Sequence, residues 1–258
     1  MAELIKVEVK DQIATVRIDN PPMNVLSSQV TKELYEVFNE LEQNNEVVVV
    51  ILTGAGERAF MAGADIKEFP NRFNNDDFKE EVTAHEMLNY LEDFPKPTIA
   101  LLNGFTLGGG LELALTSDVR IAEDHAQIGL PEIKLGIFPG GGGTQRLPRL
   151  IGTSKAKELM FSGDPLTAEV AHEWGIVNRV VAKGNGLEEA EKLANKFASY
   201  SLQALSRIKQ AVNKGIKMEL EEGLKLEESL FNDVFHTEDA KEGVKAFIEK
   251  RKPVFTHK

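Results

Sequence analysis

Two glutamates, Glu112 and Glu132, lie in glycine-rich and apolar stretches of the sequence, where a solvated carboxylate is not expected. Glu112 follows the glycines of residues 108–110, and Glu132 directly follows Pro131. Burial can raise the pKa of one carboxyl group while the other stays ionised. The pair therefore indicates acid–base chemistry on one water molecule.

Each glutamate also has a structural explanation. Glu112 falls in the first turn of an expected helix, where the helix dipole favours a charged carboxylate and the residue could act as a cap. Glu132 could be a loop residue that pairs with Arg146 or Arg149. The sequence alone leaves both explanations open.

The glycines of residues 103–112 indicate a second chemical feature. They run from an expected strand into an expected helix, so the backbone N–H groups at the helix start are not shielded by side chains. Such a place suits a developing negative charge.

Most other kinds of site are excluded or disfavoured. The chain has no cysteine, which removes thiol nucleophiles and cysteine-ligated metals. It has neither a G-x-x-x-x-G-K-[ST] P-loop nor a G-x-S-x-G elbow, and its five histidines lack metal-site spacing. Residues 54–59 fit G-x-G-x-x-A, but residues 60–63 make a poor first helical turn, so a simple turn is favoured over a dinucleotide site.

Charge and hydropathy restrict the partners. The net charge of −11 disfavours nucleic acid and anionic membrane surfaces. One basic cluster, Lys250, Arg251 and Lys252, either complements the dipole of the last helix, which we favour, or binds a ligand phosphate. Residues 1–7 lack an apolar signal core, and the longest apolar run, 47–52, is too short to span a membrane. We therefore expect a soluble, cytoplasmic protein.

The elements that position these residues repeat as strand, strand, helix. The alternation of apolar residues and the turn signals predict strands at 4–9, 13–18, 47–53, 98–103, 119–122, 127–129 and 177–181. Helices are expected from Ser27 or Ser28, from about 65, at about 76–93 and 111–116, and near 154–161, 167–174, 187–199, 202–214, 219–231 and 238–250. Residues 54–63 are expected to form a glycine-rich bend. Residues 104–110 are expected to form a connecting loop that is also rich in glycine.

This order predicts an α/β core at residues 1–198 and a helical carboxy-terminal region at 199–258. The length of 258 residues fits one large domain, or one domain with an appendage, against a prior of ~150 residues per domain. The apolar residues of the helical region need a surface to cover. A short all-helical segment of this kind often packs on a neighbouring subunit.

Taken together, the motifs resemble the enoyl-CoA hydratase/isomerase (crotonase) superfamily, and within it the short-chain enoyl-CoA hydratases. The likeness covers nearly the whole chain, and the order and spacing of its motifs are far more specific than any one of them. They are residues 20–26 (NPPMNVL), 59–67 (AFMAGADIK), 96–104 (KPTIALLNG), 107–114 (LGGGLELA), 131–132 with 139–147, and 247–255.

The resemblance implies a spiral of strand–strand–helix turns with a helical trimerisation region, usually in a trimer or a dimer of trimers. It also implies that the N–H groups of Ala64 and Gly109 form an oxyanion hole for a thioester oxygen. Ala62, Asp65, Ile66 and Lys67 would line the coenzyme A site together with those two residues. Candidates for the acyl pocket are Phe69, Pro70, Met87, Leu88, Leu91 and Phe138.

Glutamate at both acidic positions implies a hydratase, because isomerases of the family typically lack one. Glu112 would orient and deprotonate water, and Glu132 would protonate the alpha carbon, with no metal or cofactor beyond the coenzyme A of the substrate. An isomerase, an acyl-CoA hydrolase, and a silent acyl-CoA-binding or RNA-binding scaffold remain as alternatives. The implied setting is fatty-acid metabolism such as β-oxidation; chain length and pathway stay open.

Overall fold

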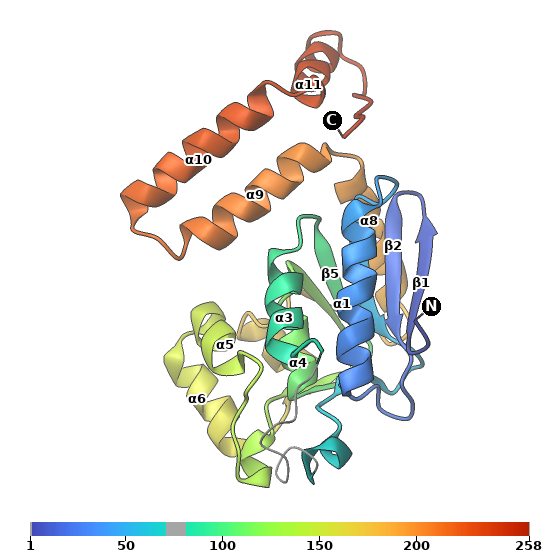
Figure 1. Ribbon diagram of the computed structural model, residues 1–258, viewed down its shortest axis with the longest axis vertical. Helices are drawn as coiled ribbons and strands as arrows, with labels where there is room; N and C mark the ends of the chain where they lie inside the picture. The colour runs from blue at the N-terminus through green and yellow to red at the C-terminus, as the bar shows by residue number, and fades with distance from the viewer. Residues whose placement is uncertain (1, 71–80, 258) are drawn as a thin grey trace.

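The computed structural model describes residues 2–70 and 81–257 (Figure 1). Its larger sheet has six strands in the order β1-β2-β3-β5-β7-β10. An antiparallel hairpin opens the sheet, and every later strand is parallel to its neighbour. The strands are β1 (Ile5–Lys10), β2 (Ile13–Ile18), β3 (Val49–Gly54), β5 (Thr98–Leu102), β7 (Val119–Glu123) and β10 (Arg179–Val181).

A smaller sheet has four strands in the order β4-β6-β8-β9. They are β4 (Ala59–Ala62), β6 (Phe105–Leu107), β8 (Gln127–Gly129) and β9 (Leu166–Thr167). The chain passes from β3 to β4, from β5 to β6 and from β7 to β8, so each turn of the spiral adds one strand to each sheet. The strand–strand–helix spiral expected from the sequence is confirmed.

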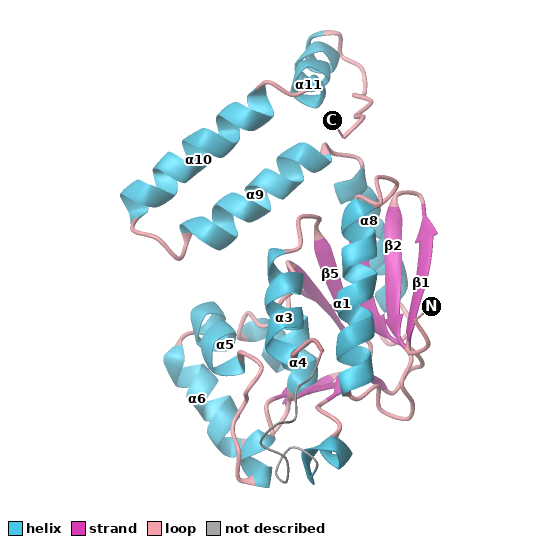
Figure 2. Cartoon of the chain, viewed as in Figure 1, coloured by secondary structure: helices cyan, strands magenta, loops and turns pink. Residues whose placement is uncertain are grey.

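Helices cover both faces of the larger sheet (Figure 2). Along β3, Val50 and Leu52 pack into the core that also holds α1 (Ser28–Gln43) and α3 (Ala84–Asp93), because side chains of a strand alternate between its faces. Val49 and Ile51 pack on the other side, against α8 (Gly186–Ala198). The continuous apolar run at this position is thus explained by burial on both faces.

The first helices begin at side-chain caps. Ser27 accepts a hydrogen bond from the Val30 N–H at the start of α1. Thr83 and Glu86 form a reciprocal capping box at the start of α3. The N-terminal end of α3 is thereby fixed, which matters because it forms one wall of the site described below.

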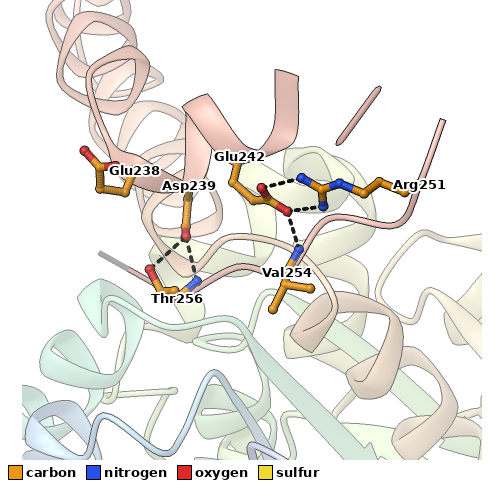
Figure 3. A pocket seen from close by; sticks show the side chains of 6 residues that line it. All are labelled: Glu238, Asp239, Glu242, Arg251, Val254 and Thr256. Carbon is orange, nitrogen blue, oxygen red and sulfur yellow. Dashed lines mark hydrogen bonds and ion pairs between the residues drawn. The ribbon is translucent and has the colours of Figure 1, made fainter. Parts of the chain in front are cut away.

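The last helices extend away from the sheets (Figure 1). They are α9 (Leu202–Gly215), α10 (Leu220–Phe235) and α11 (Glu238–Ile248), and α9 lies beside α10. The segment after α11 is held to that helix, as Figure 3 shows: the Glu242 carboxylate binds the Arg251 guanidinium and the Val254 N–H. Asp239 accepts a hydrogen bond from the Thr256 N–H at 2.7 Å.

Several sequence expectations are wrong where glycine is dense. The expected bend at 54–63 contains β4, and the expected loop at 104–110 contains β6. The helix expected at 111–116 is α4 (Gly109–Ala114). The two missed strands share a cause: flanking glycines suggested loops, although the strand residues AFMA of β4 and FTL of β6 include no glycine and pair in the smaller sheet.

Other elements were not expected at all. They are η2 (Glu132–Leu135), α5 (Gly143–Ile151) and β9. Of the helix expected at 76–93, residues 76–80 lie outside the described residues, and the described helix begins only at Ala84. The remaining helices, α6 (Thr153–Ser162) and α7 (Ala168–Glu173), match their expected positions closely. No helix in residues 2–70 or 81–257 is both long and apolar enough to cross a membrane.

Gly110 lets α4 pack against β4. A Cβ at this position would overlap the Met61 carbonyl oxygen, which belongs to the backbone and cannot move aside alone. We expect Gly110→Ala to lower stability by ~1–3 kcal/mol, the usual cost of overpacking. Gly215→Ala is the control, because its Cβ would lie 3.9 Å from the nearest atom. Thermal unfolding that is equal for both variants would contradict this explanation.

Candidate active site

Glu112 lies in α4 and is buried. Its Oε1 accepts two backbone hydrogen bonds, from the Gly141 N–H at 2.7 Å and the Gly143 N–H at 2.8 Å. These glycines belong to residues 140–143, here called the glycine loop. Because a buried carboxylate is costly unless it is hydrogen-bonded, the two amides stabilise it.

The glycine loop can approach the carboxylate only because it has no side chains. A Cβ at Gly141 would lie 2.5 Å from Glu112 Oε2, and one at Gly143 would lie 3.0 Å from Oε1. The sequence prediction used this loop only as an apolar, glycine-rich wall. Its amides are the partners of Glu112, so the explanation of Glu112 as a helix cap is wrong.

Glu132 is the first residue of η2, directly after Pro131. Its Oε2 is buried and accepts no hydrogen bond from any residue in the described part of the chain. The proposed pairing with Arg146 or Arg149 is wrong: Arg146 binds Gly141, Asn89 and Glu92, and Arg149 binds Gln145. A Cβ on Gly108 would lie 2.9 Å from Glu132 Oε1, so this carboxyl group faces the start of α4.

The two carboxyl groups differ in their electrostatic environment. Burial raises the pKa of Glu132 to about 7, and the charge of Glu112 adds to that rise. Burial also raises the pKa of Glu112, but the Gly143 and Gly141 amides and the charge of Arg146 oppose it. Glu112 therefore has partners for its ionised form, whereas Glu132 is suited to hold a proton near neutral pH.

Two main-chain amides lie beside the carboxyl groups. Gly109 is the first residue of α4, so its N–H has no acceptor within the helix. A Cβ on Gly109 would lie 3.8 Å from the Ala64 nitrogen, which brings the two amides into one neighbourhood. Neither N–H donates to a backbone or side-chain acceptor among residues 2–70 and 81–257. Both are therefore available to an oxygen atom of a ligand.

A cavity of about 530 Å³ joins these groups. It lies over α4 and is enclosed by segments from β4, α3, η2 and the glycine loop. Its lining includes Glu112, Glu132, Ala62, Ala64, Gly109, Ile66, Phe69, Leu88 and Phe138, all named from the sequence. The structure thus brings both candidate acid–base residues and both candidate oxyanion-hole residues to one place.

Some residues named from the sequence lie elsewhere. Asp65 caps η1 (Ile66–Glu68) by accepting from the Lys67 N–H, and neither Asp65 nor Lys67 is part of the cavity lining. Met87 and Leu91 are buried in the hydrophobic core and do not line the cavity. Pro70 is not part of the lining either. The cavity also contains residues that the sequence analysis missed: Leu26, Thr83, His85, Leu107, Lys134, Leu135 and Ile137.

The basic cluster at the end of α11 does not reach this cavity. Arg251 is paired with Glu242 at 2.6 Å (Figure 3). It is also paired with Glu249 at 2.7 Å, so its guanidinium holds the carboxy-terminal segment in place. In the described part of the chain, no group of three or more carboxylates and histidines could hold a metal ion.

Comparison with known proteins identifies the family of this chain. The enoyl-CoA hydratase/isomerase family model matches residues 8–258. The chain belongs to this family. It is 43% identical to the short-chain-enoyl-CoA hydratase of Clostridium acetobutylicum over 95% of this chain and 94% of that protein. It is 38% identical to the crotonyl-CoA hydratase of Syntrophomonas wolfei over 99% of both chains.

Solved structures of the family share its fold. The crystal structure of enoyl-CoA hydratase from Bacillus anthracis has a TM-score of 0.92 and 39% sequence identity, covering 99% of this chain and 100% of that one. The resemblance to the crotonase superfamily and the expected fold class are therefore confirmed.

Replacing Glu132 with Gln should change how stability depends on pH. Because its folded-state pKa is about 7 and its usual value is 4.5, the folded protein keeps a proton that the unfolded chain releases in this range. Stability from this group therefore falls as pH rises from about 4.5 to about 7. Glutamine does not titrate, so Glu132→Gln does not lose this stability as the pH rises. The melting temperature of the variant, relative to that of the wild type, should therefore increase between pH 5 and pH 8.

The gain should be a few degrees, at ~2–4 °C per kcal/mol for a chain of this size. Glu158→Gln is the control, since Glu158 is exposed on α6. A difference between Glu132→Gln and wild type that stays constant with pH would show that Glu132 titrates normally.

Proposed function

We propose that this protein hydrates trans-2-enoyl-CoA thioesters to 3-hydroxyacyl-CoA by syn addition of water. One observation carries the proposal: an amide-bound carboxylate, Glu112, and a carboxyl group with a pKa of about 7, Glu132, line one cavity with two available backbone amides. The relatives named as short-chain-enoyl-CoA and crotonyl-CoA hydratases support it.

In this mechanism the thioester oxygen accepts hydrogen bonds from the Ala64 and Gly109 amides. Glu112 takes a proton from water while the oxygen of that water bonds to C3 of the enoyl group. The electron pair of the C2–C3 bond moves toward the thioester, and the two amides stabilise the enolate-like oxygen. Glu132 then gives its proton to C2. The product contains the atoms of enoyl-CoA plus water, and no electron acceptor is needed. Before the next turnover Glu112 releases its added proton to solvent and Glu132 takes one up.

The rate contributions known for such groups are large enough for catalysis. A positioned general acid or base contributes ~10²–10⁴-fold. Loss of one oxyanion-hole donor in a known case costs ~10²–10³ in turnover. Desolvation of the cavity strengthens both effects, because charges interact more strongly where water is excluded.

We infer that the coenzyme A portion lies along the segment from Ala62 to Lys67, next to the Ala64 amide. Ala62 and Ile66 line the cavity there, and Lys67 is exposed nearby. The acyl chain would point toward the apolar side chains of Phe69, Leu88 and Phe138. The coenzyme A is part of the substrate, and the proposal requires no separate cofactor.

An enoyl-CoA isomerase or an acyl-CoA hydrolase on the same fold is the nearest alternative. Isomerisation needs one base to move a proton, and hydrolysis needs water aimed at the thioester carbonyl. The amide-bound Glu112 opposite a protonated Glu132 favours hydration, because the reaction needs a base and an acid together.

We also propose that helices α9 to α11 carry the contacts of a homo-oligomer, a trimer or a dimer of trimers. Large apolar side chains are exposed along these helices: Ile208, Val212, Ile216, Leu220, Leu224, Phe231, Phe235, Phe247 and Ile248. Extended apolar surface of this kind marks an interface between proteins. We take the partner to be a second copy of this chain, since the exposed apolar side chains form one surface along the consecutive helices α9 to α11.

Sedimentation velocity tests the oligomer. We expect the wild type to sediment at three or six times the chain mass. Phe231→Glu combined with Phe235→Glu should shift it to smaller species, because charge is then buried at an apolar contact. A wild-type monomer at micromolar concentration would contradict this proposal and leave the hydratase proposal standing.

The hydratase proposal is tested with crotonyl-CoA, by following loss of the conjugated enoyl-thioester absorbance. The wild type should remove it, and Glu112→Gln and Glu132→Gln should each lower kcat by ~10²-fold or more with little change in ligand binding. The double variant should be far less than additive, because both residues serve one step.

Glu158→Gln provides the matched control, as the same substitution on an exposed surface. A flat wild-type trace across acyl chain lengths would remove the hydratase proposal. Near-normal turnover by either active-site variant would remove only the role of that residue.

A further inference from the structure

We propose that Arg146 is a positioning residue for the reaction: its guanidinium fixes the glycine loop so that the loop amides orient the Glu112 carboxylate. The inference rests on the proposed hydration. It concerns a side chain that points away from the reacting atoms and acts through the backbone of Gly141.

The contacts of Arg146 join two elements. Its Nη1 donates to the Gly141 carbonyl oxygen at 3.0 Å. Its Nη2 donates to Asn89 Oδ1 at 2.7 Å and to Glu92 Oε2 at 3.1 Å, both on α3. The side chain is only 12% exposed, so water weakly screens its part-buried bonds to Gly141 and Glu92, whereas Asn89 lies at the surface. The guanidinium therefore ties the glycine loop to α3 through its fixed fork of donors.

Gly141 links this anchor to the site. Its carbonyl accepts from Arg146, while its N–H donates to Glu112 Oε1 at 2.7 Å. The Gly143 N–H donates to the same oxygen at 2.8 Å. With both amides on Oε1, the other oxygen, Oε2, is the one that can accept from a water molecule. A shift of the loop would change which oxygen faces the substrate.

Both charged groups lie so close to the glycine loop that it has no room for side chains. A Cβ on Gly141 would lie 2.5 Å from Glu112 Oε2. A Cβ on Gly142, whose φ is +107°, would overlap the Arg146 guanidinium on the other side. Both Arg146 and Glu112 therefore contact the backbone of the same short loop.

Charge gives Arg146 a second effect on the same group. The groups that face Glu112 are Arg146 from α5, His85 from α3 and Glu132 from η2. Arg146 and His85 favour the ionised form of Glu112, and burial opposes it. Loss of the guanidinium charge would raise the pKa of Glu112 further above its usual range.

The alternative is that Arg146 only pins α5 to α3 through its ion pair with Glu92. That role would affect folding stability and would leave the titration of Glu112 unchanged. The two roles therefore differ in the pH profile and in the division of the effect between kcat and KM.

The test uses the full-length protein with crotonyl-CoA and three variants. Arg146→Gln removes the charge and the fork. Arg146→Lys keeps the charge but cannot reach Gly141 and α3 with the same planar donors. Arg149→Gln is the control, because Arg149 lies on the same helix and, among residues 2–70 and 81–257, forms hydrogen bonds only to Gln145. Affinity for butyryl-CoA, which has no double bond to hydrate, reports on folding and binding.

For Arg146→Gln we expect kcat to fall by ~10- to 100-fold, the scale of a misplacement near 1 Å, with butyryl-CoA affinity unchanged. The acidic limb of its kcat profile should move to higher pH, because the base Glu112 must be ionised and its pKa is raised. Arg146→Lys should lower kcat, but the acidic limb of its kcat–pH profile should stay near the wild-type position because the positive charge is kept. Arg149→Gln should match the wild type in both.

Wild-type kcat and pH profile in both Arg146 variants would overturn the inference. So would a fall in kcat that Arg149→Gln reproduces. If Arg146→Gln does not fold, Arg146→Lys decides by the same criterion of reduced kcat with unchanged butyryl-CoA affinity. A wild-type protein that leaves crotonyl-CoA unchanged would instead refute the proposed hydration, so the two failures are distinguishable.

Discussion

The site depends on a buried carboxylate that accepts its hydrogen bonds from backbone amides. Glu112 sits at the start of α4, and its Oε1 takes the N–H groups of Gly141 and Gly143. Without those bonds a buried charge would be costly, and the carboxyl group would keep its proton. Glycine at 141 and 143 is required, since a side chain at either position would press on the carboxylate.

The spiral supplies the remaining groups from successive turns. Strands β4, β6 and β8 are parallel neighbours in the smaller sheet, so their carboxyl ends meet at one edge. Ala64 follows β4, Gly109 and Glu112 follow β6, and Glu132 follows β8. Residues far apart in the chain thus reach one cavity because each lies just beyond the end of its strand. This is where ligands bind in other open sheets of parallel strands.

The sequence predicted the site residues whose chemical type is unusual for the segment that contains them. Glu112 and Glu132 could be named because carboxylates are unexpected among glycine and apolar residues. The spiral could be predicted from the order of strands and helices and from the family motifs. β4 and β6 could not, since their glycine-rich flanks suggest loops and only pairing in the smaller sheet makes them strands.

Side-chain contacts between residues far apart in the chain could not be predicted from the sequence either. The partners of Arg146 on α3 lie 57 and 54 positions away in the sequence, and no local pattern connects them. The basic cluster at 250–252 shows the same limit, because its sequence left a helix-end role and a phosphate-binding role open, whereas the ion pairs of Arg251 with Glu242 and Glu249 are visible only in the structure. The residues of α3 that reach the cavity were equally hard to choose: Met87, Leu88 and Leu91 all belong to the buried core, and of these three only Leu88 also lines the cavity.

The most direct test of the two-carboxyl site is the product formed from crotonyl-CoA in D₂O, identified by nuclear magnetic resonance. Syn addition by Glu112 and Glu132 predicts 3-hydroxybutyryl-CoA with one deuterium at C2, as a single diastereomer. A mixture of diastereomers at C2 would contradict delivery of the proton by one fixed acid. Free coenzyme A, or a double bond moved without added water, would contradict hydration itself.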